Sequence, residues 1–332
     1  MQKAVIDGTE SASVIDVDVG TPPPGWVKIK IHVAPMCTEF KAFTAGTERD
    51  QLDHEAAGEI VASASDRRSV GDRVVAIPQY ACGTCEHCRG GEYIHCRDQL
   101  PTDDIETGTF AQYLLKPDWL TVSVPDDVSY LHASMACCGL GPTLGAADAI
   151  NVGPTDTVLV NGLGPVGLGG VINATYRNAR VIGVEPNEYR AAVARELGAI
   201  RVIDPTTEDV IDVVDAVTDG AGADKVFETS GVPAGQRTAV DAVRPRGAIA
   251  FVADAGEVAL EVGPDLVQGG TTVVGSWHYP ERLIPAMRTM IGDVGDPIDT
   301  LVTHEYPLSA IQTAFERQLT GDCGKVVLRP WT

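Results

Sequence analysis

The chain has 332 residues, of which 44% are hydrophobic and 21% charged; this is ordinary for a soluble globular protein, and the length suits two domains. Forty-six acidic residues against 25 lysines and arginines give a formal net charge of −21, which disfavours nucleic acids and anionic membranes as partners. The acidic excess fits adaptation to a salty cytoplasm or the residue bias of some genomes, and it does not bear on chemistry.

No stretch approaches the roughly 20 apolar residues of a membrane span, and the first ten residues, MQKAVIDGTE, have no apolar signal core. We therefore expect a cytoplasmic protein. Its eight cysteines would then be kept mostly as thiols, since disulfides are rare in reducing compartments.

The first part of the chain predicts antiparallel strands. KAVIDG (3–8) and WVKIKIHVA (26–34) alternate apolar and polar residues, and the proline-rich GTPPPG between them is typical of a turn. Further strands are predicted at AAGEIVAS (56–63) and GDRVVAIP (71–78).

A glycine-rich loop, ACGTCEHCRGGEYIHC, holds four cysteines with the spacing Cys82-x2-Cys85-x2-Cys88-x7-Cys96. Two disulfides, a metal site and idle packing are the alternatives. The expected reducing compartment disfavours disulfides, and four closely spaced thiolates suit tetrahedral zinc. Because four protein ligands leave no open position, this zinc would be structural.

Three further segments carry metal-binding residue types: Cys37 in APMCTEF, His54 and Glu55 in LDHEAAGEIV, and the pair Cys137–Cys138 in MACCGLG. Taken singly, each residue fits a core or surface position, and a buried cysteine is usually a small apolar side chain. Together they could supply two thiolates and an imidazole, leaving one zinc position for a substrate oxygen. A zinc ion placed in this way lowers the pKa of an alcohol.

From Thr157 the chain alternates strands with helical segments, which predicts a parallel, doubly wound sheet. The first strand, TVLVN, runs into the glycine turn GLGPVG and a helical stretch. In this context a G-x-G-x-x-G turn lets a pyrophosphate approach backbone amides at a helix N-terminus. The predicted phosphate-binding residues are Gly162, Gly164, Pro165, Val166 and Gly167.

The second strand of this region, ARVIGVE, ends at Glu185, 23 residues after Gly162. A carboxylate there can accept hydrogen bonds from the ribose hydroxyls of NAD and would repel the 2′-phosphate of NADP. Arg190 lies close enough in sequence to leave NADP as an alternative.

In this order, Cys37, His54-Glu55, the four-cysteine loop, Cys138 and GLGPVG resemble the zinc-dependent medium-chain dehydrogenase/reductase superfamily, which includes alcohol dehydrogenase. The resemblance covers essentially the whole chain. It implies an α/β fold in which a GroES-like β-barrel catalytic domain (1–139 and 279–332) encloses an inserted Rossmann domain (140–278). The structural zinc loop would span residues 82–96.

The resemblance also implies site residues. A catalytic zinc would be held by Cys37, His54 and Cys138, with Glu55 as support or transient ligand, so that the chain would bind two zinc ions. Thr229 and Ser230 fall where the family lines the nicotinamide site, although a strand-end turn is an equal alternative. Lys325 could reach the cofactor pyrophosphate or be an ordinary surface lysine.

The chain departs from the family pattern beside the first ligand. The usual Cys-Gly-Ser/Thr-Asp is Cys37-Thr38-Glu39-Phe40, which places Glu39 where a hydroxyl normally relays the substrate proton. Ala42 stands where a second relay histidine is often found, and Asp53 replaces the usual glycine before His-Glu. We expect Glu39, with Thr38 as the alternative, to handle the proton.

The sequence thus predicts a dehydrogenase that transfers hydride between NAD and a small-molecule secondary alcohol, polyol, sugar or cyclitol, and family analogy implies a homodimer or homotetramer. Two alternatives remain: an NADPH-dependent carbonyl reductase of the same fold, and a non-catalytic zinc- and nucleotide-binding relative.

Overall fold

The computed structural model describes residues 1–102 and 105–332. The chain divides into two compact units. The first comprises Met1–Cys138, Pro280–Gly295 and Val302–Thr332, and the second comprises Gly139–Tyr279 and Asp296–Leu301. The predicted domain limits, 139 and 278, fall one residue from two of these divisions, whereas the prediction has no counterpart to the short return of residues 296–301 to the second unit.

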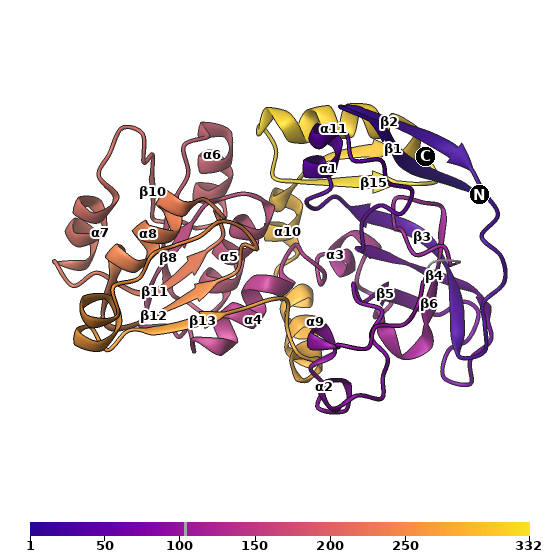
Figure 1. Cartoon of the computed structure of the whole chain (residues 1–332), viewed down its shortest axis with the longest axis horizontal. Coiled ribbons are helices and arrows are strands. Elements are labelled where there is room, and N and C mark those ends of the chain that lie inside the picture. Colours follow the sequence, from indigo (N-terminus) through magenta and orange to yellow (C-terminus); the bar gives the residue numbers. More distant parts are fainter. Residues whose placement is uncertain (103–104) are drawn as a thin grey trace. The chain divides into compact units, whose positions relative to one another are not determined.

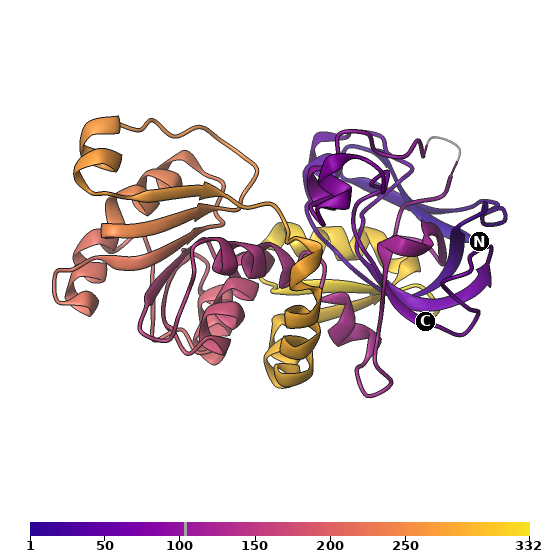
Figure 2. The same cartoon turned by 90° about the horizontal axis from the view of Figure 1, so that it is seen from below.

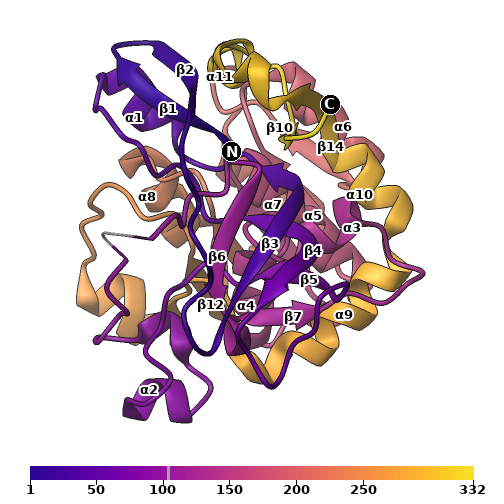
Figure 3. The same ribbon diagram turned by 90° about the vertical axis from the view of Figure 1, so that its right-hand side faces the viewer.

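The first unit is built on a seven-stranded sheet with the order β14-β15-β3-β4-β5-β7, in which β6 also pairs with β3. Strands β6, β3 and β4 lie side by side (Figure 3) and pair antiparallel. The strand bounds are β3 Trp26–Pro35, β4 Ala56–Ser63, β5 Arg73–Ala76, β6 Tyr113–Pro117, β7 Thr121–Ser123, β14 Val302–Pro307 and β15 Lys325–Arg329. Because β15 pairs antiparallel with β3, this sheet joins both ends of the chain.

A separate two-stranded sheet, β1 (Gln2–Gly8) with β2 (Ser11–Asp16), completes the strands of the first unit among the described residues. The α-helices of the first unit are α1 Phe40–Ala45, α2 Glu86–Arg89, α3 Tyr130–Ser134, α9 Ile284–Asp293 and α11 Ile311–Thr320. The alternation of β3 explains the core: Val27, Ile29 and Ile31 are fully buried, whereas the residues between them are half-buried.

The second unit is a six-stranded parallel sheet with the order β10-β9-β8-β11-β12-β13, as the alternating pattern predicts (Figure 1). Its edge strand β13 lies beside β12 (Figure 2). The strand bounds are β8 Thr157–Asn161, β9 Arg180–Val184, β10 Arg201–Ile203, β11 Ala223–Glu228, β12 Val243–Phe251 and β13 Thr272–Gly275. Helix α5 packs against α4 and α6, and α7 packs against α8.

The helix bounds of this unit are α4 Gly141–Ala149, α5 Pro165–Tyr176, α6 Glu188–Glu196, α7 Val210–Thr218 and α8 Pro233–Ala242, and α10, Gly295–Leu301, joins the two units in the chain. The strands after β8 are added first on one side of it (β9, β10) and then on the other (β11, β12, β13). Nucleotides bind at such a switch point, beyond the carboxyl ends of the strands. No helix of the described residues is both long and apolar enough to span a bilayer.

Candidate catalytic metal centre and nucleotide loop

Three separate segments of the first unit bring the predicted catalytic ligands together. Cys37 follows β3, His54 and Glu55 directly precede β4, and Cys138 follows α3. One ligand atom from each of these four residues lies within 4.8 Å of the others, and His54 Nε2 is 3.1 Å from Cys138 Sγ. Cys137 lies elsewhere, with its thiol donating to the Ala76 carbonyl at 3.5 Å. Two thiolates, one imidazole and a carboxylate within this distance fit a zinc ion with one exchangeable position.

Glu55 is held by both of its carboxylate oxygens. Oε1 accepts a hydrogen bond from Lys325 Nζ at 2.7 Å, and Oε2 accepts one from the backbone N–H of Cys138 at 3.0 Å. Both side chains of the ion pair are essentially inaccessible to solvent. Burial alone would lower the pKa of Lys325, and the Glu55 carboxylate beside it raises that pKa, whereas burial raises the pKa of Glu55 to about 7. Glu55 thereby fixes the backbone that carries Cys138.

The structure gives Lys325 a buried partner in Glu55, whereas the sequence suggested a pyrophosphate contact or a surface position. The surface alternative is wrong, because Lys325 is 0% exposed. The pyrophosphate contact stays a prediction.

Glu39 lies at the N-terminus of α1, and its carboxylate shares a cluster with Asp53 and His54 in which the ligand atoms are within 4.8 Å of one another. Glu39 Oε2 and Asp53 Oδ1 are buried without a hydrogen-bond partner. Burial raises the pKa of both carboxyls, and a divalent cation beside His54 would act in the opposite direction. The backbone places Thr38 at an exposed position, so the carboxylate of Glu39 is the more enclosed of the two proposed proton acceptors.

The cysteine loop places four thiols around one point. The sulfur of Cys85 lies 3.5 Å from that of Cys88 and 3.9 Å from that of Cys96, and the sulfurs of Cys82 and Cys88 are 3.9 Å apart. These distances exceed the roughly 2.05 Å of a disulfide bond. Zinc–sulfur bonds of about 2.3 Å in a tetrahedron put the sulfurs about 3.8 Å apart, so the donor set fits zinc.

The Cys82 sulfur also accepts hydrogen bonds from the backbone N–H of Thr84 at 3.4 Å and of Cys85 at 3.3 Å. Together with the hydroxyl of Thr84, these donors lower the pKa of the Cys82 thiol to about 6. These contacts favour the thiolate form of Cys82, whereas burial raises the pKa of the Cys88 and Cys96 thiols.

In the second unit, the GLGPVG segment forms the turn between β8 and α5. Gly162 has a φ of 91°, which favours glycine, and a Cβ on Gly167 would lie 1.9 Å from the Gly162 carbonyl oxygen. Gly164 is the N-cap of α5, Pro165 and Val166 open its first turn, and no heavy atom lies within 4 Å of a Cβ built on Gly164. This open helix N-terminus has the geometry that phosphate groups require.

The neighbouring predicted residues support this turn. Thr229 Oγ1 donates to the carbonyl of Gly162 at 2.6 Å, and a Cβ on Gly162 would approach Ser230 Cα to 2.6 Å. Glu185 follows β9, and its Oε2 accepts a hydrogen bond from the Leu163 N–H at 2.9 Å. The backbone N–H of Arg190 donates to the N-cap residue Asn187. The predicted cofactor residues of this unit therefore share one end of the sheet.

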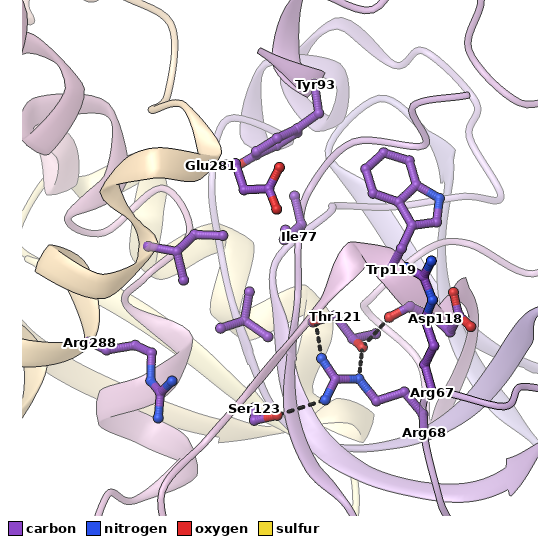
Figure 4. A pocket seen from close by; sticks show the side chains of 12 residues that line it. Arg67, Arg68, Ile77, Tyr93, Asp118, Trp119, Thr121, Ser123, Glu281 and Arg288 are labelled. Carbon is purple, nitrogen blue, oxygen red and sulfur yellow. Dashed lines mark hydrogen bonds between the residues drawn. The ribbon is translucent and has the colours of Figure 1, made fainter. Parts of the chain in front are cut away.

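A separate cavity of about 470 Å³ in the first unit contains none of the predicted site residues (Figure 4). Three arginines line it, together with Tyr93 and Trp119. Arg68 is fixed there by hydrogen bonds to Thr121 and Ser123. Glu281 and Asp118 are also in the lining and offset the arginine charge, so this cavity lacks the single-sign field of an anion site.

Sequence reasoning missed contacts that support the metal ligands. Besides the Lys325–Glu55 pair, Gln318 Nε2 donates to the Cys37 carbonyl at 3.3 Å, and Thr109 Oγ1 donates to Asp53 Oδ2 at 3.0 Å. Gln318 and Cys37 are 281 positions apart in the chain, so no local pattern connects them.

Comparisons with known proteins agree with this architecture. Residues 23–126 match the family described as "Alcohol dehydrogenase GroES-like domain", and residues 165–292 match "Zinc-binding dehydrogenase". The chain is 30% identical to L-threonine 3-dehydrogenase of Pyrococcus furiosus, with 95% of this chain and 94% of that protein covered. It is also 30% identical to sorbitol dehydrogenase of Bacillus subtilis, with 99% and 97% covered.

Among solved structures, alcohol dehydrogenase TADH from Thermus sp. ATN1 superposes with a TM-score of 0.90 at 25% identity, covering 99% of each chain. Benzyl alcohol dehydrogenase from Acinetobacter calcoaceticus gives a TM-score of 0.87 at 25% identity, covering 99% of this chain and 98% of that one. The GroES-like and Rossmann expectations are confirmed, and the protein is an oxidoreductase of the zinc-dependent alcohol and polyol dehydrogenase type. The chain belongs to the zinc-dependent medium-chain dehydrogenase/reductase superfamily.

Proposed function

We propose that this protein is an NAD-dependent dehydrogenase whose catalytic zinc is held by Cys37, His54 and Cys138, with Glu55 as support. The observation that carries the proposal is the convergence of these four side chains, from three distant segments, to within 4.8 Å. A zinc ion at this position would polarise the oxygen of a substrate alcohol and lower its pKa.

The residues around the ligands have separate tasks in this proposal. Glu55, bonded to Lys325 and to the Cys138 N–H, holds a ligand-bearing turn in place. Glu39 accepts the substrate proton at its carboxylate, for which its buried, unpartnered Oε2 is the support. A carboxylate can accept a proton and keep it, so Ala42 at the second relay position is no obstacle. Thr38 remains the alternative proton carrier.

The proposed nucleotide is NAD. Glu185 lies after β9 with its carboxylate against the glycine turn, where a negative charge disfavours a 2′-phosphate. Gly162, Gly164, Pro165, Val166, Gly167, Thr229 and Ser230 would line the same site. Higher catalytic efficiency with NADP than with NAD in the wild-type protein would overturn this assignment and favour the carbonyl reductase alternative, with Arg190 as the residue to test.

The substrate class is a secondary alcohol with neighbouring polar groups, such as a polyol, sugar, cyclitol or β-hydroxy amino acid. The names of the relatives, L-threonine 3-dehydrogenase and sorbitol dehydrogenase, support this class. The test is NAD reduction by the zinc-replete protein across a panel of these compounds and simple alcohols, with Cys37→Ser as the control. We expect turnover in the wild type alone. A protein that binds zinc and NAD but reduces no NAD with any compound would favour the non-catalytic alternative.

We also propose a structural zinc at Cys82, Cys85, Cys88 and Cys96, a cytoplasmic location and a homodimer or homotetramer. The cytoplasm would keep the four thiols reduced. Among the described residues β13 pairs with β12 alone, so its outer edge is available to a second copy. Light scattering that gives 35 kDa across concentrations would contradict the oligomer.

A further inference from the structure

The residue before His54 has an unusual backbone conformation. Asp53 has a φ of 62°, in the left-handed region that favours glycine, which is the residue the family pattern usually has at this position. Non-glycine residues persist in this region when the surrounding structure determines them, and such positions cluster at functional sites. The conformation of Asp53 therefore raises the question of what its side chain does there.

The segment that carries Asp53 and His54 is held by hydrogen bonds to a neighbouring loop segment, residues 107–110. The carbonyl of Leu52 accepts hydrogen bonds from the N–H groups of Thr109 at 2.8 Å and Phe110 at 3.2 Å. Gln51 Oε1 accepts from the Gly108 N–H at 2.7 Å. This packing leaves no room for a Cβ on Gly108, which would lie 2.8 Å from the Leu52 nitrogen. The backbone on the N-terminal side of Asp53 is thus held in place.

The two oxygens of Asp53 have different surroundings. Oδ2 accepts hydrogen bonds from Thr109 Oγ1 at 3.0 Å and from the Glu55 N–H at 3.3 Å. Oδ1 has no hydrogen-bond partner and lies 3.7 Å from His54 Nδ1, although the Asp53 side chain is 0% exposed. The other ring nitrogen of His54, Nε2, is 3.1 Å from the Cys138 sulfur. Asp53 therefore faces the nitrogen that points away from the thiol.

We propose that Asp53 is a positioning residue for the metal ligand His54: when the metal is bound, Asp53 Oδ1, which lies 3.7 Å from His54 Nδ1 in this structure, accepts a hydrogen bond from Nδ1–H and so directs the Nε2 lone pair at the metal. This inference rests on the proposed zinc at Cys37, His54 and Cys138. Metal-binding histidines usually donate their second nitrogen to a carboxylate or carbonyl, which fixes the tautomer and the ring orientation. In this structure the left-handed backbone of Asp53 and the approach of its carboxylate to the ring of the adjacent His54 occur together.

Two substitutions separate the carboxylate from the backbone. In Asp53→Asn the donors Thr109 Oγ1 and Glu55 N–H retain the amide oxygen, so the NH₂ group faces Nδ1 and two donors oppose each other. Asp53→Gly removes the carboxylate and suits the left-handed backbone. We expect both variants to weaken zinc binding at this centre about 10- to 100-fold, the usual cost of losing such a partner.

The test measures zinc affinity of the full-length protein by competition with a chelator, and the visible spectrum after cobalt substitution. We expect Asp53→Gly to keep or raise the thermal unfolding midpoint while losing affinity, a split that a merely structural role does not produce. Thr109→Val, which removes one donor to Oδ2, should show a smaller loss and serves as the second variant if Asp53→Asn does not fold.

Affinity and cobalt spectra equal to wild type in both Asp53 variants would overturn the positioning role. The control is His54→Ala, which should lose this ion and keep the one in the cysteine loop. If His54→Ala retains both ions, the proposed metal centre is itself wrong, and that failure is distinct from a failure of the Asp53 assignment alone.

Discussion

The two thiol clusters of the first unit differ in how the chain assembles them. The four cysteines of the loop lie within 15 consecutive residues, so one segment of the chain brings their sulfurs together. Cys37, His54 and Cys138 come from three segments and depend on buried polar partners, Glu55 with Lys325 among them. The loop offers four sulfur ligands and leaves no position for a substrate, so we call it the closed site. The second set, the open site, includes the imidazole of His54, which is 34% exposed. The comparison supports the proposal that the loop holds a structural zinc and that Cys37, His54 and Cys138 hold a catalytic one.

The largest effect should come from the closed site. Cys88, which is 7% exposed, packs with Ile94 and Leu120 around the loop. We expect Cys88→Ser to lower the unfolding midpoint by on the order of 10 °C or more, since metal binding at a closed site contributes directly to folding. Cys37→Ser should shift the midpoint far less and abolish turnover. Calorimetry of both variants tests this, and equal shifts would remove the distinction between the sites.

At the open site, Glu39→Gln should lower turnover about 10²- to 10⁴-fold, the range of a lost general acid–base group, with zinc content unchanged. Thr38→Val is the matched variant and should keep most activity. Steady-state kinetics across pH provide the measurement. Near-wild-type turnover and pH profile in Glu39→Gln, together with a crippled Thr38→Val, would transfer the proton step to Thr38.

The stability of the open site should also depend on the buried ion pair of Glu55 and Lys325. Lys325→Met leaves the Glu55 carboxylate uncompensated, and we expect a loss of about 3–5 kcal/mol in the free energy of unfolding. The double variant with Glu55→Gln should recover much of that loss, because no buried charge then remains. Chemical denaturation measures both. If Lys325→Met unfolds as the wild type does, the pair does not support the Cys138 turn.

The last effect, which depends on pH, concerns Lys116, beside the segment that enters the cysteine loop. Its Nζ donates to the Gln79 carbonyl at 2.8 Å and lies 3.6 Å from the Tyr80 ring centroid. The ring favours the ammonium by about 0.5–2 kcal/mol, less than the cost of burying an unpaired charge. Burial therefore lowers the pKa of Lys116 well below its usual range.

The unfolded chain then binds one more proton than the folded one at any pH between the lowered pKa and about 10.4. Across this window the stability of the wild type should rise with pH relative to Lys116→Met, by up to about 1.4 kcal/mol per pH unit. Denaturation of the two proteins between pH 7 and pH 10 measures the difference. A constant difference would mean that Lys116 is charged in the folded state.

The same contrast explains what the sequence could predict. The cysteine loop and the glycine turn are local, because their spacing and the flanking strands carry the chemistry, and both were predicted residue by residue. The family resemblance supplied Cys37, His54 and Cys138. The Glu55–Lys325 pair spans 270 positions, and it forms because β15 pairs with β3 and β3 pairs with β4, which Glu55 directly precedes. The sequence shows Asp53 in place of the usual glycine, but the role proposed for it depends on a backbone angle that the sequence pattern does not encode.

Zinc stoichiometry tests the central claim, that two chemically different metal sites share one unit, most directly. Elemental analysis of metal-replete protein should give two zinc ions per chain for the wild type and one for Cys37→Ser, with the remaining ion resistant to a chelator that inactivates the wild type. One zinc or fewer in the wild type, or two in Cys37→Ser, would contradict the account.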